Sequence, residues 1–195
     1  MKKLLLTLTA AAAVTFAANA QTEKGKTLLG GTVSYDYSNV KDVDGNDQSF
    51  SIIPSVGVFV NDNVAVGLGV GYAWSQDDNG TIKSQSGEFS AAPFARLYKG
   101  DGNFKFFGQL SVPMGWGNSK SDGEKIANTE RYGVELAPGF AFFPTEKIGI
   151  EFSVRGLYYQ NTTLKPEGSS DNVSSNSFGL DASSFAPRIG LQFYF

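Results

Sequence analysis

The final segment of the chain, from Phe185 to Phe195, constrains the fold more than any other stretch. It reads F-A-P-R-I-G-L-Q-F-Y-F, so every odd position is apolar and every even position except Tyr194 is small, polar or charged. A repeat of two is the pattern of a β-strand, whose successive side chains point to opposite faces. An alternating stretch of about ten residues with aromatic side chains is typical of a strand in a transmembrane β-barrel. The segment therefore predicts a membrane-spanning strand.

The N-terminus has the pattern of a secretory signal peptide. Two lysines precede an apolar stretch over residues 4–16, and Ala18-Asn19-Ala20 matches an A-x-A cleavage site. The apolar stretch is short for a membrane span, so an uncleaved anchor is the less favoured alternative. The chain has no cysteine, which excludes disulfides and a lipid-bearing cysteine at the cleavage site. We therefore expect a signal peptide over residues 1–20 and a single mature domain over residues 21–195.

The mature domain is mildly acidic. The chain has 16 Lys+Arg and 19 Asp+Glu, and residues 1–20 hold two lysines and no acid, which leaves 14 basic and 19 acidic side chains and a net charge of −5. Nucleic-acid binding requires a basic surface, so no nucleic-acid partner is expected. Beyond residue 20, no segment is long and apolar enough for a membrane helix. The 23 glycines and the 13% aromatic content favour strands and turns.

Seven further segments show the same alternation as the last one. The predicted strands are 28–37, 49–60, 64–74, 88–98, 104–116, 131–142, 148–159 and 185–195. Short turns alternate with long polar segments, which are 38–48, 75–86, 117–130 and about 160–183. Short turns on one side and long loops on the other are the plan of outer-membrane barrels. We therefore predict an all-β fold, an eight-stranded antiparallel up-and-down transmembrane β-barrel, with both termini in the periplasm and four long loops outside.

Strand charges distinguish this barrel from a soluble one of lipocalin type, whose apolar face is turned inward. No charge lies on the apolar face of any predicted strand, as lipid requires, because a basic side chain at mid-bilayer costs about 2–4 kcal/mol. Nine charged residues occupy the opposite face: Asp36, Glu88, Arg96, Lys105, Arg131, Glu135, Glu151, Arg155 and Arg188. The apolar stripes therefore face lipid, and the charges face the lumen.

Aromatic side chains near the strand ends predict two girdles at the membrane surfaces. The outer girdle would contain Tyr35, Tyr37, Phe50, Tyr72, Trp74, Phe89, Trp116, Tyr132, Tyr158 and Phe185. The inner girdle would contain Phe104, Phe106, Phe142 and Phe195. Four prolines recur on the lipid face of alternate strands, at Pro54, Pro93, Pro138 and Pro187. Because proline removes a donor from the strand ladder, we expect bulges or weakened pairing at these positions.

Three segments carry a family pattern. They are F-S-I-I-P-S-V-G-V-F-V-N-D-N-V-A-V-G-L-G-V-G-Y from Phe50 to Tyr72, A-P-F-A-R at 92–96 and the closing P-R-I-G-L-Q-F-Y-F. With the signal peptide, they resemble the small outer-membrane β-barrel (porin-like) proteins of Gram-negative bacteria, especially of the Bacteroidetes. The plan is similar to that of the OmpA- and OmpX-type barrels. The resemblance implies that the barrel-assembly machinery reads the last strand, with Phe193 and Phe195 as the assembly signal.

The predicted lumen admits two functional interpretations. An eight-stranded barrel is just wide enough for its side chains to fill. The expected lumen charge network is Glu88, Arg96, Lys105, Arg131, Glu135, Glu151, Arg155 and Arg188, accompanied by Gln109 and Gln192. If acids and bases pair, the lumen is filled, and the protein has a structural or surface-binding role through its loops. If they do not, the charges line a narrow porin-like channel for ions or small solutes, and the Gly/Ala lining of 64–74 leaves room for one.

Enzymatic chemistry has little support in the sequence. The chain has no histidine, so a Ser-His-Asp arrangement is absent. The acidic run 42–47 has calcium-ligand composition but the wrong register for an EF-hand, and we expect a solvated turn. We therefore expect no catalytic residue, no metal and no cofactor. The expected partners are membrane lipid, lipopolysaccharide and the assembly machinery, with a surface ligand of segment 160–183 as an open alternative, and the expected state is a monomer.

Overall fold

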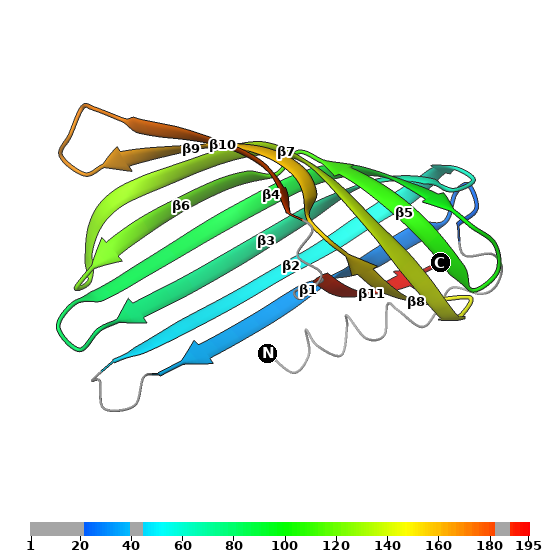
Figure 1. Cartoon of the computed structure of the whole chain (residues 1–195), viewed down its shortest axis with the longest axis horizontal. Coiled ribbons are helices and arrows are strands. Elements are labelled where there is room, and N and C mark those ends of the chain that lie inside the picture. The colour runs from blue at the N-terminus through cyan, green and yellow to red at the C-terminus, as the bar shows by residue number, and fades with distance from the viewer. Residues whose placement is uncertain (1–21, 40–44, 182–187) are drawn as a thin grey trace, which may run out of the picture.

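The computed structural model describes residues 22–39, 45–181 and 188–195, and these residues form strands and connecting turns without a helix (Figure 1). The strands are β1 (Thr27–Ser38), β2 (Asn46–Asn61), β3 (Val64–Asp78), β4 (Lys83–Lys99), β5 (Phe104–Ser111), β6 (Met114–Ser121), β7 (Glu124–Thr145), β8 (Ile148–Ser153), β9 (Gly156–Pro166), β10 (Val173–Asp181) and β11 (Arg188–Tyr194). Within the described ranges, no helix long and apolar enough to cross a membrane is found.

The eleven strands form a closed antiparallel barrel with eight strands in its wall. Three wall strands consist of two pieces in line, because β5 and β6 both pair with β4 and β7, and β8 and β9 both pair with β7. The third divided wall strand consists of β10 and β11, because β10 pairs with β9 and β11 pairs with β8. The pairing of β1 with β11, from Leu28↔Tyr194 to Gly31↔Leu191, closes the wall. The predicted fold class is therefore confirmed.

The two faces of the wall differ as the alternation predicted. Apolar side chains on the outside are strongly exposed, among them Val33, Leu68, Val134 and Leu191. Their neighbours along the strands point into the barrel. A surface this apolar is unusual in a water-soluble protein but is what the hydrocarbon of a bilayer requires.

The two ends of the barrel differ in their connections. At one end, here called the short-turn end, residues 62–63, 100–103 and 146–147 join consecutive strands. The first of these turns is tight, and Asn63 adopts a left-handed conformation with φ of 71°. The described chain begins and ends here, because Thr27 and Phe195 exchange backbone hydrogen bonds of 2.8 and 2.9 Å. The opposite end, here called the hairpin end, carries four long hairpin extensions whose strands also pair with those of the neighbouring hairpins (Figure 1).

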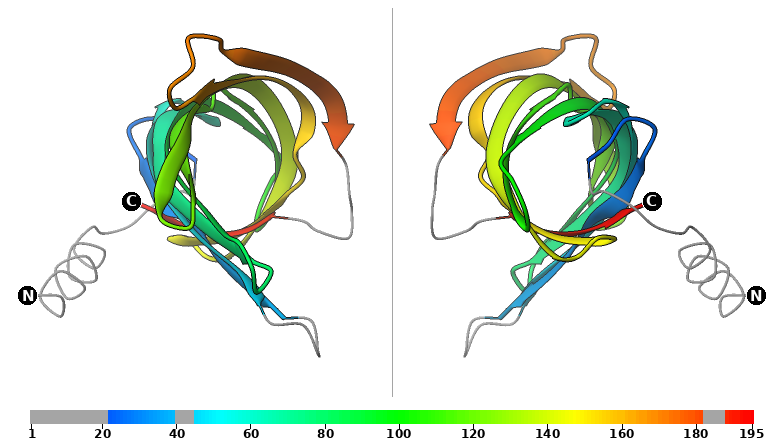
Figure 2. Two further views of the ribbon diagram at one scale, coloured as in Figure 1. Left: turned by 90° about the vertical axis from the view of Figure 1, so that its left-hand side faces the viewer. Right: turned by 90° about the vertical axis from the view of Figure 1, so that its right-hand side faces the viewer.

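The long polar loops predicted at the hairpin end are largely paired strands. Pairing continues to Asn46↔Asp78 between β2 and β3, to Asp78↔Lys83 between β3 and β4, and to Ser121↔Glu124 between β6 and β7. The predicted loop 160–183 contains most of β9 and the whole of β10, which curves outside the ring of the wall (Figure 2). Beyond the membrane both faces of a strand meet water, so the ladder continues without the apolar alternation that identifies it in the sequence. The acidic run 42–47 and residues 185–187 lie wholly or partly outside the described residues.

The prolines lie beside interruptions in the wall, as expected. At Pro54 the pairing of β2 with β3 skips from Ile52↔Tyr72 to Ser55↔Gly69. Pro93 lies beside the break between β5 and β6, and its carbonyl accepts the Val112 amide at 3.0 Å. Pro138 lies beside the break between β8 and β9. For the last two, the break falls in the neighbouring strand rather than at the proline, and Pro187 lies outside the described residues.

The break between β8 and β9 corrects one predicted position. The register with β7 changes by one residue across it, from Gly139↔Ser153 to Leu136↔Leu157. Leu157 and Tyr159 are therefore the outward-facing residues, and both are strongly exposed. Tyr158 pairs with Glu135, a lumen residue, so its assignment to the outer girdle was wrong. A one-residue bulge reverses the faces of all later residues in a strand, and no motif in the sequence marks it.

Candidate functional site

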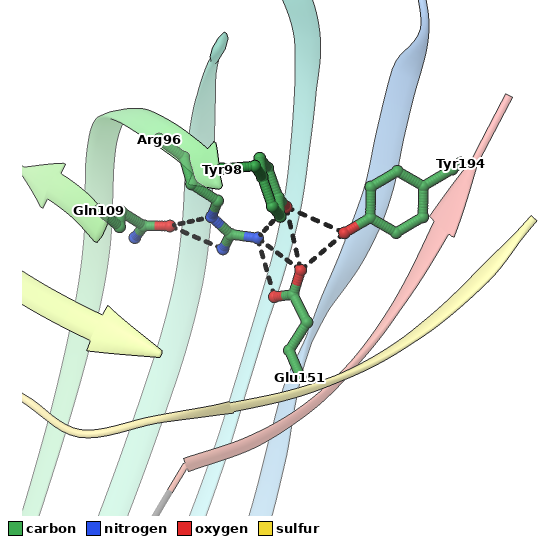
Figure 3. A network of polar contacts seen from close by, with 5 residues as sticks. All are labelled: Arg96, Tyr98, Gln109, Glu151 and Tyr194. Carbon is green, nitrogen blue, oxygen red and sulfur yellow. Dashed lines mark hydrogen bonds and ion pairs between the residues drawn. The ribbon is translucent and has the colours of Figure 1, made fainter. Parts of the chain in front are cut away.

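The lumen of the barrel holds a buried polar cluster near the short-turn end (Figure 3). Arg96 of β4 donates through Nη1 to both carboxylate oxygens of Glu151 of β8, at 2.7 and 2.8 Å. The hydroxyls of Tyr98 and Tyr194 donate to Glu151 Oε1 at 3.1 and 2.7 Å and lie 2.9 Å from each other. Gln109 Oε1 accepts from Nε and Nη2 of Arg96 at 2.9 and 2.7 Å. These five residues, here called the polar plug, join β4, β5, β8 and β11 across the barrel.

Apolar side chains surround the plug and fill the barrel towards the short-turn end. The Arg96 guanidinium lies 4.5 Å from the ring centre of Phe107, within cation–π range. Two further rings contact the tyrosines of the plug: the ring centre of Phe59 lies 5.7 Å from that of Tyr98, and the ring centre of Phe143 lies 5.1 Å from that of Tyr194. The buried apolar cluster, here called the floor, contains Leu28, Phe59, Ala65, Phe94, Phe107, Ala141 and Phe143. Plug and floor together occupy the lumen at this level.

Glycines on the inner wall make room for this filling. A Cβ added to Gly67 would lie 2.5 Å from Phe94 Cζ, and one added to Gly139 would lie 2.4 Å from Phe107 Cζ. Both rings therefore lie directly against the backbone of the wall. The Gly/Ala lining of β3, which in the sequence left space for a channel, is partly covered by Phe94.

Two further ion pairs lie nearer the hairpin end. Arg155 Nε is 3.2 Å from Glu135 Oε2, and Arg131 Nη1 is 2.9 Å from Glu88 Oε1. Side-chain exposure rises along the barrel from 8% and 6% at Arg96–Glu151, through 29% and 10% at Arg155–Glu135, to 39% and 23% at Arg131–Glu88. The ion pairs of the lumen are therefore most buried at the plug and most exposed towards the hairpin end.

A cavity of about 420 Å³ lies in the lumen against the plug. Its wall includes Arg96, Gln109 and Glu151 of the plug and the rings of Phe94 and Phe107. Glu135, Gln192 and five hydroxyl side chains contribute further polar groups to the wall; the hydroxyls are those of Thr32, Ser55, Ser90, Ser111 and Ser153.

Six of the eight predicted network residues form the three ion pairs, and the remaining two are Lys105 and Arg188. Lys105 donates to the hydroxyl of Thr22 at 2.6 Å, where the first described residues cross the short-turn end. The backbone of Arg188 begins β11, and its side chain lies outside the described part. Phe193 pairs with Leu29 and Ile148, and its ring stacks on Phe195 at 6.5 Å.

Sequence reasoning missed the tyrosines of the plug and the aromatic floor. Tyr98, Tyr194, Phe59 and Phe107 all have lumen parity in their strands, and that parity was the available signal. Among the described residues, no group of three or more acidic side chains is placed to hold a metal ion.

Comparisons with known proteins agree with this geometry. A family model described as outer membrane protein beta-barrel domain matches residues 6–184. The crystal structure of the outer membrane protein OprG from Pseudomonas aeruginosa is similar, with a TM-score of 0.51, 14% identity and coverage of 91% of this chain and 99% of that one. Neisserial surface protein A has a TM-score of 0.47, 14% identity and coverage of 88% and 98%. No curated protein sequence matches the chain. At this identity the structural likeness supports the fold alone.

Proposed function

Because this chain belongs to the outer membrane protein beta-barrel domain family, we propose that it is a barrel with a closed lumen that carries its four hairpin extensions outside the cell as a structural or binding surface. Membrane lipid surrounds its wall, and the outer membrane is its location. In this proposal the short-turn end and both termini face the periplasm, as short turns do in barrels of this kind. The chain lacks histidine and cysteine, and we propose no enzymatic activity.

The polar plug is the observation that carries the proposal. Its central ion pair is almost fully buried, and every charge in it is paired. Separating a buried ion pair leaves uncompensated charge in the barrel, so the pair stays in place, whereas an open channel needs a path that ions can pass. Plug and floor therefore block the axis at the periplasmic end.

The proposal also covers export of the chain and its assembly in the outer membrane. We infer that residues 1–20 are removed as a signal peptide and that residues 21–195 are the mature barrel. The assembly machinery would read the last strand, with Phe193 and Phe195 as its aromatic signal. Lipopolysaccharide would contact the outward-facing polar residues above the outer aromatic girdle. A monomer is sufficient, because the strands close on themselves.

A narrow channel is the second candidate, and one observation favours it. Polar side chains, among them Glu135, line part of the cavity against the plug, and the Arg155–Glu135 and Arg131–Glu88 ion pairs are partly exposed. If the plug moved aside, this path would cross the barrel.

Single-channel conductance in a planar bilayer tests the closed lumen. We expect the refolded mature protein to be silent, and we expect openings when both plug charges are removed in the Arg96→Ala, Glu151→Ala variant. The matched control is Arg131→Ala, Glu88→Ala, which removes an equal pair of charges on the open side and should remain silent. Steady conductance of the unmodified protein, with ion selectivity changed by the control, would establish the channel instead.

A further inference from the structure

We infer that the cavity above the plug is a blind binding pocket for a small, neutral, polyhydroxylated solute of about monosaccharide size, entered from the hairpin end. This inference rests on the proposed closed lumen, because the plug forms the bottom of the pocket. The volume of about 420 Å³ falls in the range of small-molecule sites, which is roughly 300–1,000 Å³. Exposure of the two outer ion pairs gives the route of entry.

The charges around the pocket point to a neutral ligand. Arg96 and Glu151 neutralise each other at 2.7 Å, and Glu135 is held by Arg155 at 3.2 Å. At the described side chains that line the pocket, an ionic ligand would lose its hydration without gaining an unpaired counter-charge in return. A neutral solute avoids that cost.

The hydrogen-bonding groups point to a polyol. Five hydroxyl side chains line the cavity from five different strands: Thr32, Ser55, Ser90, Ser111 and Ser153. A hydroxyl both donates and accepts, as do the hydroxyls of a sugar, so either partner can adapt to the other. Such a ring of small polar groups lets one solute make contacts on several sides at once.

Gln192 supplies a further polar contact. It lines the same cavity and is only 5% exposed. Within the described chain, its carbonyl oxygen Oε1 has no hydrogen-bond partner. This oxygen lies against the β1 backbone at Gly30, whereas the side-chain nitrogen of Gln192 lies 4.0 Å from a Cβ added to the cavity-lining Gly190 and is the polar group nearer to a ligand. The rings of Phe94 and Phe107 add apolar surface for the C–H groups of a sugar.

Two glycines allow the pocket to be filled without moving the wall. A Cβ on Gly69 would have its nearest neighbour at 3.7 Å, and one on Gly190 would have it at 4.0 Å. Both residues line the cavity. Gly69→Phe and Gly190→Phe would therefore place a ring in the pocket from β3 and from β11. Gly108→Phe is the matched control, because Gly108 pairs with the outward-facing Leu97 and has nothing within 4 Å of its added Cβ.

The test is a titration of the isotope-labelled, refolded protein with glucose, followed by amide chemical shifts in detergent micelles. We expect saturable shifts at Ser90, Ser111 and Ser153, kept in Gly108→Phe and weakened about tenfold or more in both pocket-filling variants. Glucosamine and gluconate, charged probes of similar size, should also bind about tenfold more weakly or worse. Heat-dependent gel mobility confirms that each variant is folded.

The outcomes separate the pocket from the closed lumen. If the protein does not conduct and glucose produces no saturable shift, the pocket is overturned and the closed lumen stands. Binding that survives both filling variants would also overturn the pocket, and equal binding of the charged probes would overturn its preference for neutral ligands. A conducting protein would instead remove the closed lumen on which the inference rests.

Discussion

At the scale of single residues, Glu151 is the centre of the polar plug. Three donors converge on its carboxylate, from Arg96, Tyr98 and Tyr194. These donors come from the middle and the end of the chain, so the cluster forms only after β11 has joined the wall. Formation of the complete cluster around the buried pair therefore depends on closure of the barrel.

Removing one partner of this pair should be costly. Arg96→Met leaves the Glu151 carboxylate buried without its counter-charge, and we expect unfolding to become easier by about 3–5 kcal/mol. Urea unfolding in lipid vesicles measures the change. Arg131→Met is the control, because its pair is 39% and 23% exposed and such pairs contribute only about 0–1 kcal/mol. Equal losses in the two variants would show that the plug has no special role in stability.

Strand parity placed Arg96 and Glu151 in the lumen but did not show that they pair. The two residues lie on opposite sides of the barrel, and their meeting depends on how far each strand is staggered against the next. That stagger is a property of the closed wall, and no short segment contains it. The same limit applies to Tyr98 and Tyr194, which join the plug from β4 and β11.

At the scale of the strand, the wall has a membrane part and a longer aqueous part. The alternation of the sequence identified the membrane part of all eight wall strands, because lipid on one face and the lumen on the other impose a period of two. It did not identify β10 or the outer halves of β6 and β9. It also could not locate the bulge at the end of β8, because a change of face requires only one extra residue.

Strand β7 offers a test of where the membrane lies. Leu136 and Asn128 have the same outward parity, and Leu136 lies in the apolar belt whereas Asn128 lies in the polar extension. We expect Leu136→Lys to destabilise the folded barrel by about 2–4 kcal/mol and Asn128→Lys by about 0–1 kcal/mol. Unfolding in vesicles compares them. If the two lysines were equally tolerated, the outward face of β7 would not be in contact with lipid.

At the scale of the whole molecule, the barrel is asymmetric along its axis. One end is filled by the floor and the plug, and the other carries the four hairpin extensions. The filled short-turn end and the extended hairpin end present different surfaces to the two sides of the membrane, so we expect them to meet different partners. The central claim is that the hairpins meet the outside of the cell and that the filled end meets the periplasm.

Surface labelling of intact cells tests that claim most directly, and the absence of native cysteine makes it clean. Thr81→Cys places a thiol in the exposed turn between β3 and β4, and Asp101→Cys places one in the short turn between β4 and β5. With a maleimide reagent too large to cross the outer membrane, we expect the cysteine at position 81 to be labelled and the one at position 101 to react only after the cells are lysed. Labelling of position 101 on intact cells, with position 81 protected, would reverse the orientation and contradict the proposed role of the hairpins.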